Sequence, residues 1–525
     1  MVGPPRRSGN VIDARVDADE APSVDHPRFG GDRAGGVEPP ASGMAARSLS
    51  ARATGRIDLG EAPVGGPGPG EPPQHVLTDA SLIAVGHALP EERWPQALLS
   101  GRIASAWGLE GAPLERWRRI VEGSAIEHRH GVRPIEPTFA LSTAERMEIF
   151  ALEAPALAAR AARSAMLSAE VAAASITDLI VVTCTGFAAP GVDVALVDRL
   201  GLAPSVRRAQ LGFMGCFGAI SGVRAAVGAC CADPRSTALV VCVELCTLHL
   251  RRDLDPANLV ATALFGDGAA AAVVAGAESA AARRLRDPAA GDASAPESGA
   301  PRRTGPVGTG SRTERAAPAA SSSRSGRDAV GSAFGACSGA ARSFRPRSIG
   351  VGRPMLFPTG RDAMTWTITD EGFAMNLSRA VPAELRRGIA AAARAGGASE
   401  RTRFAVHPGG PGILDAIDAG LELGGGRGIE HAWGVLRDVG NISSGSVLLV
   451  LERLLRGDAI DVPPVSPAPG GAAARGAAAD PIMLLAFGPG LTIETLVIGA
   501  ATSRPSIGDR DAAPPGATAA VRTDR

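Results

Sequence analysis

Apolar and polar residues alternate along two blocks of the chain with the spacing of short strands and longer helices. In the first block, short apolar runs predict buried strands and longer periodic runs predict helices, at 179–182, 238–241, 142–167 and 217–231. The second block repeats this arrangement, with strands and then helices predicted at 404–407, 482–487, 492–499, 411–423 and 443–456. Strands and helices that alternate at this spacing favour mixed or parallel sheets covered by helices. The pattern therefore predicts an α/β protein built from two similar halves.

Four stretches lack this periodicity and are rich in small residues, proline and charge. Segments of that composition carry too little apolar surface to pack on a core. We therefore predict two folded halves, at 76–276 and 348–500, separated and flanked by unstructured segments. These are a disordered N-terminal extension at 1–75, a low-complexity insertion at 277–347, a linker at 462–480 and a disordered tail at 501–525.

Composition narrows the class of protein. The 525 residues are 45% hydrophobic, enough for a sizeable core, and the 54 basic and 54 acidic residues cancel. Without a charge bias, we expect neither a nucleic acid nor an anionic membrane surface as a partner. The seven cysteines show no spacing typical of secreted disulfides or zinc sites, so we expect a cytoplasmic location. We also expect no signal peptide and no membrane span.

Cys216 lies in the run LGFMGCFGAISG, at residues 211–222. An apolar strand ends in glycine there, and the cysteine opens a predicted helix with small residues along one side. A thiol at a helix N-terminus meets unpaired N–H groups and the positive end of the helix dipole, which lower its pKa. Cys216 is therefore a candidate nucleophile. The alternative is a buried structural cysteine, the interpretation that we favour for the other apolar-run cysteines Cys230, Cys231 and Cys242.

Two further polar residues stand in glycine-rich contexts. His407 ends an apolar strand and is followed by Pro-Gly-Gly-Pro-Gly, which removes side-chain bulk around the imidazole. The alternative is a hydrogen-bonded core histidine. Asn441 lies in the run GNISSGS at a helix start, where an N-cap is the alternative. Each signal is weak alone, whereas the cysteine, histidine and asparagine in this order and these contexts are more specific.

These sequences resemble those of the type III polyketide synthases, the relatives of chalcone and stilbene synthase. The resemblance covers roughly 76–276 and 346–500. Besides the Cys216 run, it rests on ALFGDGAA at 263–270, HPGG at 407–410, GNISS at 440–444 and FGPGLTIET at 487–495. His-Pro-Gly-Gly together with Phe-Gly-Pro-Gly is specific to this family. Ketoacyl-carrier-protein synthase III relatives share the cysteine, histidine and asparagine but usually surround the last two differently.

The resemblance implies an α/β thiolase-like fold of two βαβαβ-type halves, assembled as a homodimer. Cys216 would accept an acyl group from a coenzyme A (CoA) thioester, as a thiolate paired with His407. His407 and Asn441 would donate hydrogen bonds to the malonyl thioester carbonyl, where charge develops when CO2 leaves. Phe265 matches a gatekeeper phenylalanine that helps orient malonyl-CoA, with core packing as its alternative role. CoA thioesters are the implied substrates, and no metal or redox cofactor is implied.

Other implied substrate contacts depart from the pattern of the plant enzymes. Arg116 and Arg119 match basic residues that meet the CoA phosphates, whereas the third basic position of that set is Gly123. Met375 falls on a second gatekeeper phenylalanine, and Ala189 falls on a methionine that reaches into the partner's cavity. Three cavity positions that carry threonine in plant enzymes are Cys184, Cys246 and His249. The changes indicate a pocket unlike that of a flavonoid-forming enzyme and closer to bacterial members.

The resemblance therefore predicts iterative decarboxylative condensation of malonyl-CoA onto an acyl-CoA starter, followed by cyclisation to a pyrone, resorcinol or naphthol. An aliphatic starter is favoured, because the flexible Met375 thioether can move aside for a linear chain. Two alternatives stay open. One is a ketoacyl synthase III-like enzyme that makes a single condensation on a carrier protein, and the other is an inactive thiolase-fold scaffold.

Overall fold

The computed structural model describes five stretches of the chain, at 77–286, 346–350, 352–357, 360–457 and 480–499. The predicted extension at 1–75 and tail at 501–525 lie outside these described residues. So do most of the predicted insertion at 277–347 and all but the last residue of the linker at 462–480.

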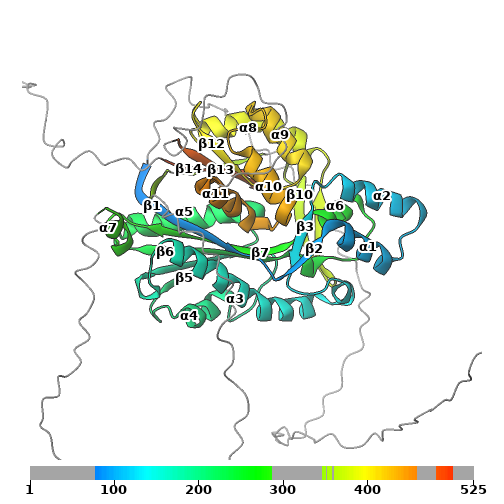
Figure 1. The fold of residues 1–525 in the computed structure, drawn as a ribbon, viewed down its shortest axis with the longest axis horizontal. Coiled ribbons are helices and arrows are strands. Elements are labelled where there is room, and N and C mark those ends of the chain that lie inside the picture. Colours follow the sequence, from blue (N-terminus) through cyan, green and yellow to red (C-terminus); the bar gives the residue numbers. More distant parts are fainter. Residues whose placement is uncertain (1–76, 287–345, 351, 358–359, 458–479, 500–525) are drawn as a thin grey trace, which may run out of the picture. The chain divides into compact units, whose positions relative to one another are not determined.

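A ten-stranded mixed sheet runs through the described part of the chain, in the order β12-β13-β14-β8-β1-β7-β6-β4-β5, with β9 beside β14 (Figure 1). The first half contributes β1 (Leu77–Ala88), β4 (Asp178–Thr183), β5 (Arg207–Gly212), β6 (Thr237–Leu245) and β7 (Asp267–Ala275). The second half contributes β8 (Arg347–Gly350), β9 (Arg353–Leu356), β12 (Arg403–Val406), β13 (Ile482–Gly488) and β14 (Thr492–Ile498). The halves meet where β8 pairs antiparallel with β1. Each half combines parallel pairs, such as β4–β6 and β12–β13, with antiparallel ones.

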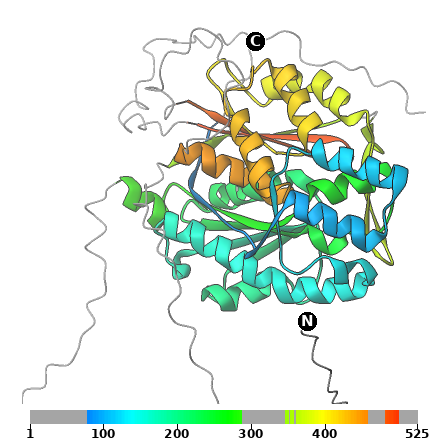
Figure 2. The same ribbon diagram turned by 45° about the vertical axis from the view of Figure 1, so that its right-hand side comes forward.

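Helices cover the sheet and also fill the space between its two halves (Figure 1 and Figure 2). In the first half these are α1 (Gln96–Trp107), α2 (Gly111–Glu122), α3 (Thr143–Ser168), α4 (Val192–Leu200), α5 (Gly218–Ala232), α6 (Pro256–Leu264) and α7 (Ala280–Arg286). The second half has α8 (Val381–Ala395), α9 (Pro411–Leu421), α10 (Ile429–Val439) and α11 (Ser446–Arg456). Helix α3 packs on β1, β6 and β7, whereas α5 contacts β4 and β6 as well as β14. The two halves therefore share a central helical layer.

Strands β6 and β7 show why their sequences read as continuous apolar runs. Every residue of both strands is buried. Alternate side chains of a strand point to opposite faces, so both faces of these strands must be covered. In β6, Ala238, Val240 and Cys242 join the core beside α5, whereas Leu239 and Val241 join the core beneath α3. The strands are therefore central elements packed between two helical layers.

Two short antiparallel pairs of strands lie beside the main sheet. One pairs β2 (Glu92–Pro95) with β3 (His128–Gly131), and the other pairs β10 (Met364–Thr369) with β11 (Gly372–Leu377). Strand β11 contacts α6 and the short helical turn Cys246–His249. The β10–β11 hairpin therefore lies over the part of the first half that carries several of the predicted cavity residues.

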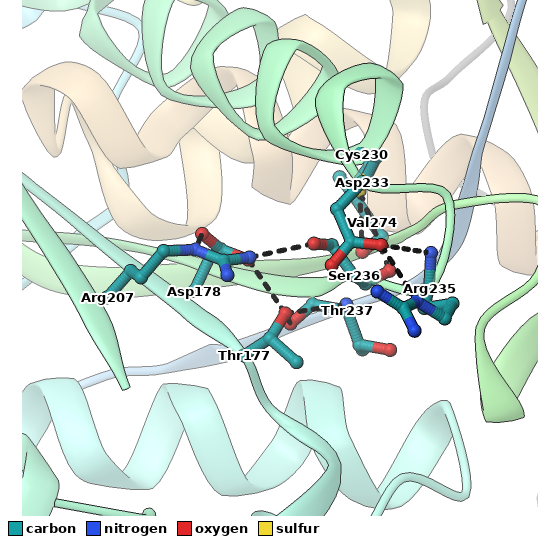
Figure 3. A network of polar contacts seen from close by, with 9 residues as sticks. All are labelled: Thr177, Asp178, Arg207, Cys230, Asp233, Arg235, Ser236, Thr237 and Val274. Carbon is teal, nitrogen blue, oxygen red and sulfur yellow. Dashed lines mark hydrogen bonds and ion pairs between the residues drawn. The ribbon is translucent and has the colours of Figure 1, made fainter. Parts of the chain in front are cut away.

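A polar network fixes the edge of the sheet where β4 and β5 begin (Figure 3). The Arg207 guanidinium donates two hydrogen bonds to the carboxylate of Asp178, at 2.7 and 2.6 Å, and a third to the Ser236 hydroxyl at 2.8 Å. Thr177 donates to Asp178 at 2.7 Å and accepts from the Thr237 N–H at 2.9 Å. Because β5 is the last strand of the sheet, these bonds hold an otherwise exposed edge in register.

The predicted strands and helices are confirmed to within a few residues, and the predicted start of the insertion needs correction. The predicted insertion was placed from residue 277, but α7 follows there, with Ala281 and Ala282 buried beside α3. Because an alanine-rich helix has the same composition as a low-complexity segment, composition did not distinguish α7 from the insertion. One segment, Gly215–Ala232, also has the length and composition to suit a membrane span, although 61% of it is buried inside the fold. It is a core helix of the layer between the halves.

Candidate active site

Cys216 lies in a tight turn between β5 and α5, within the short 3-10 helix Gly215–Phe217. The turn needs unusual backbone: Gly215 has a φ of +74°, and a Cβ there would collide with the ring of Pro489. A Cβ on the adjacent Gly488 would lie 3.3 Å from the Cys216 backbone nitrogen and 2.9 Å from the Phe217 ring. The glycine and proline of the FGPG motif therefore pack directly against the turn that carries the thiol.

His407 follows β12 and is fully buried. Its ring meets the ring of Phe487 edge-on, with centroids 5.4 Å apart, and a Cβ on Gly409 would lie 2.8 Å from that same ring. Phe487 is the first residue of the FGPG motif. The residues Phe487–Pro489 thus contact both the His407 loop and the Cys216 turn, and this brings the two predicted residues to one place in the fold.

Asn441 joins this arrangement through Ser443. The Asn441 Oδ1 accepts a hydrogen bond from the Ser443 N–H at 2.8 Å and another from the Ser446 hydroxyl at 3.4 Å. The Ser443 hydroxyl lies 3.7 Å from the Cys216 Sγ. Because two donors hold the amide oxygen, the Nδ2 group remains as a donor with no protein partner among the described residues. Asn441 is therefore oriented to donate a hydrogen bond rather than to accept one.

Burial shifts the pKa values of both Cys216 and His407. Burial raises the pKa of the Cys216 thiol to about 12, although a hydrogen bond from Ser443 opposes the shift. Burial lowers the pKa of His407 to about 3, and neither ring nitrogen has a hydrogen-bond partner among the described residues. The expected lowering of the thiol pKa by a helix N-terminus is therefore outweighed by desolvation. Both shifts favour the neutral forms of the two groups.

A cavity lies beside the Cys216 turn. Five predicted residues line it, namely Cys184, Cys246, His249, Phe265 and Met375. Ser443 also lines it, so the cavity reaches the residue in contact with the Cys216 thiol. The structure therefore gathers the predicted substrate residues around one space.

Sequence reasoning missed further residues of this cavity, of which Trp366 and Phe373 on the β10–β11 hairpin are the largest. Trp366 stands directly opposite Met375 in the hairpin, and its ring centroid lies 6.0 Å from that of Phe265. The available signal was the alternation of large apolar residues with threonines from 364 to 369, which predicts a strand with one apolar face. The pattern gives no indication that this face closes a cavity.

The His249 ring is held by contacts on both of its nitrogens and on its face. Its Nε2 lies 2.6 Å from the Thr185 carbonyl oxygen, and its Nδ1 accepts from the Phe373 N–H at 3.2 Å. The ring also stacks on Phe373, with centroids 4.0 Å apart. Burial lowers the pKa of His249 to about 4, so the ring is neutral and both nitrogens are occupied. His249 therefore fastens the β10–β11 hairpin to the cavity wall.

A buried carboxylate lies behind the cavity wall and was also missed. Glu244 accepts hydrogen bonds from the Cys184 N–H at 3.0 Å, from the Thr185 hydroxyl at 2.8 Å and from the Ser444 hydroxyl. Burial raises the pKa of Glu244 to about 7. The single acidic residue in the apolar run of β6 was the signal for it. The carboxylate ties the segment after β4 to the Ser443–Ser444 turn.

The predicted Arg116 and Arg119 lie on α2 and line a second space, an open groove. Arg379, which sequence reasoning did not single out, lines the same groove. The three arginines are exposed, and no acidic side chain among the described residues forms an ion pair with them. The groove continues along Gly409–Ile413, next to His407, and along Leu264, next to Phe265. It therefore runs from a positively charged rim towards the buried site.

Comparison with known proteins finds relatives of both halves. The profile for chalcone and stilbene synthases, N-terminal domain, matches residues 73–279, and the C-terminal domain profile matches residues 350–502. The 1,3,6,8-tetrahydroxynaphthalene synthase of Streptomyces peucetius is 30% identical over 388 residues, covering 72% of this chain and 87% of that protein. The alpha-pyrone synthesis polyketide synthase-like protein of Mycobacterium tuberculosis is 27% identical over 439 residues, covering 81% and 92%.

Solved structures show the same fold. The C-terminal type III polyketide synthase domain of Steely1 from Dictyostelium has a TM-score of 0.60 at 24% identity, covering 81% of this chain and 99% of that chain. The 1,3,6,8-tetrahydroxynaphthalene synthase of Streptomyces coelicolor has a TM-score of 0.57 at 24% identity, covering 81% and 100%. These likenesses confirm the predicted thiolase-like α/β fold.

Proposed function

Because the chain belongs to the chalcone and stilbene synthase family of type III polyketide synthases, which are acyltransferases, we propose that it condenses malonyl-CoA repeatedly onto an acyl-CoA starter held on Cys216. The observation that carries this proposal is the position of the Cys216 turn. It contacts the Phe487–Pro489 segment, which also contacts the His407 loop, and it contacts Ser443, which binds Asn441. An apolar cavity and an arginine-lined groove flank this site.

Loading begins when the Cys216 thiol attacks the thioester carbon of the acyl-CoA starter. The Sγ–carbon bond forms, the bond from that carbon to the CoA sulfur breaks, and His407 transfers the thiol proton to the departing CoA. A neutral imidazole is the protonation form that can accept this proton. Keeping the free thiol protonated also limits its oxidation between turnovers, because the thiolate is the reactive form.

Extension follows when malonyl-CoA occupies the groove. Loss of CO2 leaves an electron pair that is shared with the thioester carbonyl oxygen as an enolate. The Asn441 Nδ2 and an N–H of His407 donate to that oxygen, which stabilises the transition state more than the ground state. The enolate carbon then attacks the acyl-Cys216 carbonyl, and the Cys216 thiolate leaves. The lengthened chain, now a CoA thioester, returns to Cys216 for the next round, and cyclisation ends the sequence.

The arginines of the groove supply the first test of this proposal. Replacing Arg379 by alanine should raise the KM for malonyl-CoA, because an exposed contact with a CoA phosphate contributes about 1 kcal/mol, roughly fivefold in KM. The N-acetylcysteamine thioester of malonate lacks every phosphate, so its KM should not change. Arg116→Ala and Arg119→Ala should behave in the same way.

Arg199→Ala is the matched control, since Arg199 is an exposed arginine on α4 outside the groove. It should leave both KM values unchanged. An equal rise for malonyl-CoA and for the truncated thioester in the groove variants would contradict a phosphate contact.

We also propose an aliphatic starter that leads to a pyrone or resorcinol. The cavity wall is mainly apolar, with Leu250, Phe265, Trp366, Phe373 and Met375, and the two polar nitrogens of His249 are already bonded. Two relatives bear names for different products, a tetrahydroxynaphthalene and an alpha-pyrone. The apolar wall and the flexible Met375 support the second kind of product. Substitution of Cys184 or Cys246 should change product size.

Trp366→Ala should shift the preferred starter towards longer acyl-CoA chains, because it removes the largest ring from the wall. Each further methylene that the pocket buries contributes about 0.8 kcal/mol, roughly fourfold in kcat/KM. Met375→Phe should shift the preference towards shorter starters. Competition between acyl-CoA starters of increasing length, with product masses as the readout, measures both shifts.

Thr367→Ala is the control, since Thr367 is exposed on the opposite face of the same strand. Its chain-length profile should match that of the wild type. If Trp366→Ala leaves the profile unchanged, or if malonyl-CoA alone is consumed fastest and gives a pentaketide, the aliphatic starter is wrong.

A further inference from the structure

Arg129 is a fully buried arginine on β3, and neither the resemblance nor the motifs single it out. Its Nη1 donates to the carbonyl oxygens of Thr262 and Phe265, at 2.6 and 2.8 Å. Its Nε donates to the Gln96 Oε1 at 2.8 Å, and the Gln96 Nε2 donates to the Ala263 carbonyl at 2.9 Å. Arg129 and Gln96 therefore act as one unit at the end of α6.

The carbonyl groups at a helix C-terminus have no partner within the helix. At the end of α6, Arg129 and Gln96 bind the carbonyls of Thr262, Ala263 and Phe265. The remaining carbonyl, that of Leu264, accepts from the Asn441 N–H at 3.0 Å. The Gly266 N–H donates to the Asn441 carbonyl at 3.0 Å, which completes a two-way bridge. The end of α6 is thus bonded both to Arg129 and to the catalytic candidate Asn441.

The aliphatic part of Arg129 also supports the segment of Asn441 directly. Gly440 has a φ of +77°, and a Cβ there would lie 2.9 Å from the Leu264 carbonyl oxygen and 3.0 Å from the Arg129 Cγ. Only a residue without a side chain lets the backbone lie this close to the arginine. One buried side chain therefore contacts both segments, the one that carries Phe265 and the one that carries Asn441.

Burial of the charged Arg129 side chain lowers the stability of the fold. Burial lowers the pKa of Arg129 to about 9, with the nearby Asp267 opposing the shift. The guanidinium stays charged at neutral pH, and its Nη2 has no hydrogen-bond partner among the described residues. An incompletely bonded buried charge destabilises a fold relative to an apolar side chain of similar size. A role in positioning accounts for its presence.

We propose that Arg129 is a positioning residue for malonyl-CoA decarboxylation, because it fixes the end of α6, with Phe265, against the Gly440–Asn441 turn. It acts through Phe265 and Asn441 and does not touch the substrate. This inference rests on the proposed function. The proposal predicts that loss of Arg129 slows decarboxylation more than loading of Cys216. Loading does not require the Asn441 donor, whereas decarboxylation does.

The test compares two steps in the same variant. Arg129→Lys keeps the charge but cannot bind Gln96, Thr262 and Phe265 together. Because a displacement of about 1 Å can cost roughly a hundredfold in rate, we expect kcat for CO2 release from malonyl-CoA to fall about 10- to 100-fold. The KM for malonyl-CoA and the rate of acyl transfer from acyl-CoA to Cys216 should stay within about twofold of the wild type.

Arg146→Lys is the matched control. Arg146 is also fully buried and also binds backbone carbonyls, those of Leu141, Leu248 and Leu250. It should lower the Tm without changing the ratio of decarboxylation to loading. If Arg129→Lys reduces both steps in the same proportion, as the control does, Arg129 is structural only and the proposal is wrong.

Gln96→Ala provides a second test of the proposal if the Arg129→Lys variant does not fold. It removes the bond to the Ala263 carbonyl and one support of Arg129, so a selective fall in decarboxylation of roughly threefold is expected. An unchanged ratio in Gln96→Ala would overturn the proposal. Failure of the proposed function is distinguishable from either result, because the wild-type protein would then release no CO2 from malonyl-CoA.

Discussion

Cys216→Ala should abolish acyl loading, with a loss of overall activity on the order of 10⁴-fold or more, because the acyl chain then has no covalent attachment. The prediction depends on position rather than on thiol chemistry alone. Cys216 is the cysteine whose Sγ lies beside Ser443, in the turn that packs against the FGPG motif. Mass spectrometry of the intact protein after treatment with acyl-CoA measures the loading directly.

The neighbouring thiols provide the controls for this experiment. The Cys184 Sγ accepts a hydrogen bond from the Gly215 N–H at 3.0 Å, and a serine can preserve that bond. Burial raises the pKa of Cys184 and Cys246 well above the ordinary value and also raises that of Cys216, so the three thiols differ in position rather than in the direction of their pKa shift. Cys184→Ser and Cys246→Ser should both still carry the adduct. An adduct that survives on Cys216→Ala would refute the assignment of the nucleophile.

Asn441→Ala should slow CO2 release from malonyl-CoA by roughly a hundredfold or more, since removal of one preorganised oxyanion donor costs about 3 kcal/mol. The preorganisation is visible in the bonds from the Ser443 N–H and the Ser446 hydroxyl, which hold the amide oxygen and leave the Nδ2 group as the donor. Release of labelled CO2 from carboxyl-labelled malonyl-CoA measures this step separately from condensation.

Asn441→Asp sharpens the same test. The aspartate keeps the acceptor that Ser443 and Ser446 bind but replaces the Nδ2 donor by a second oxygen, which repels an enolate. It should therefore lose at least as much decarboxylation as the alanine variant. Acyl loading of Cys216 should remain within a few-fold of the wild type in both variants. Release of CO2 at the wild-type rate by either variant would show that Asn441 is only a structural residue.

The sequence predicts well those elements whose burial follows from the local order of apolar and polar residues. Strand β6 is apolar from Ala238 to Val243 because helices cover both of its faces, and the glycines around His407 and Cys216 mark places where other segments approach closely. The motifs around the cysteine, the histidine and the asparagine carry the resemblance. Their convergence through Phe487 and Ser443 was not visible in the sequence, because it depends on contacts between the two halves.

The rest could not be predicted because it depends on tertiary environment. A helix N-terminus predicts a lowered pKa for the Cys216 thiol, whereas burial in the folded protein raises the pKa instead. Trp366 belongs to a hairpin with an ordinary alternating pattern and becomes a cavity residue only when that hairpin lies over α6. Arg379 is distant in sequence from Arg116 and shares its groove only through the fold. The residues next to each position in the sequence do not indicate which residues will be its neighbours in the fold.

Incubation of the full-length wild-type protein with carbon-13-labelled malonyl-CoA tests the central claim most directly. Acyl-CoA starters of several chain lengths, malonyl-CoA alone and a malonyl carrier protein are compared as donors, and the labelled units in each product are counted by mass spectrometry. We expect a cyclised product that contains several labelled units, formed from free CoA thioesters on an aliphatic starter. A product with a single labelled unit, formed only from the carrier protein, would contradict iterative condensation on Cys216, as would the absence of any product.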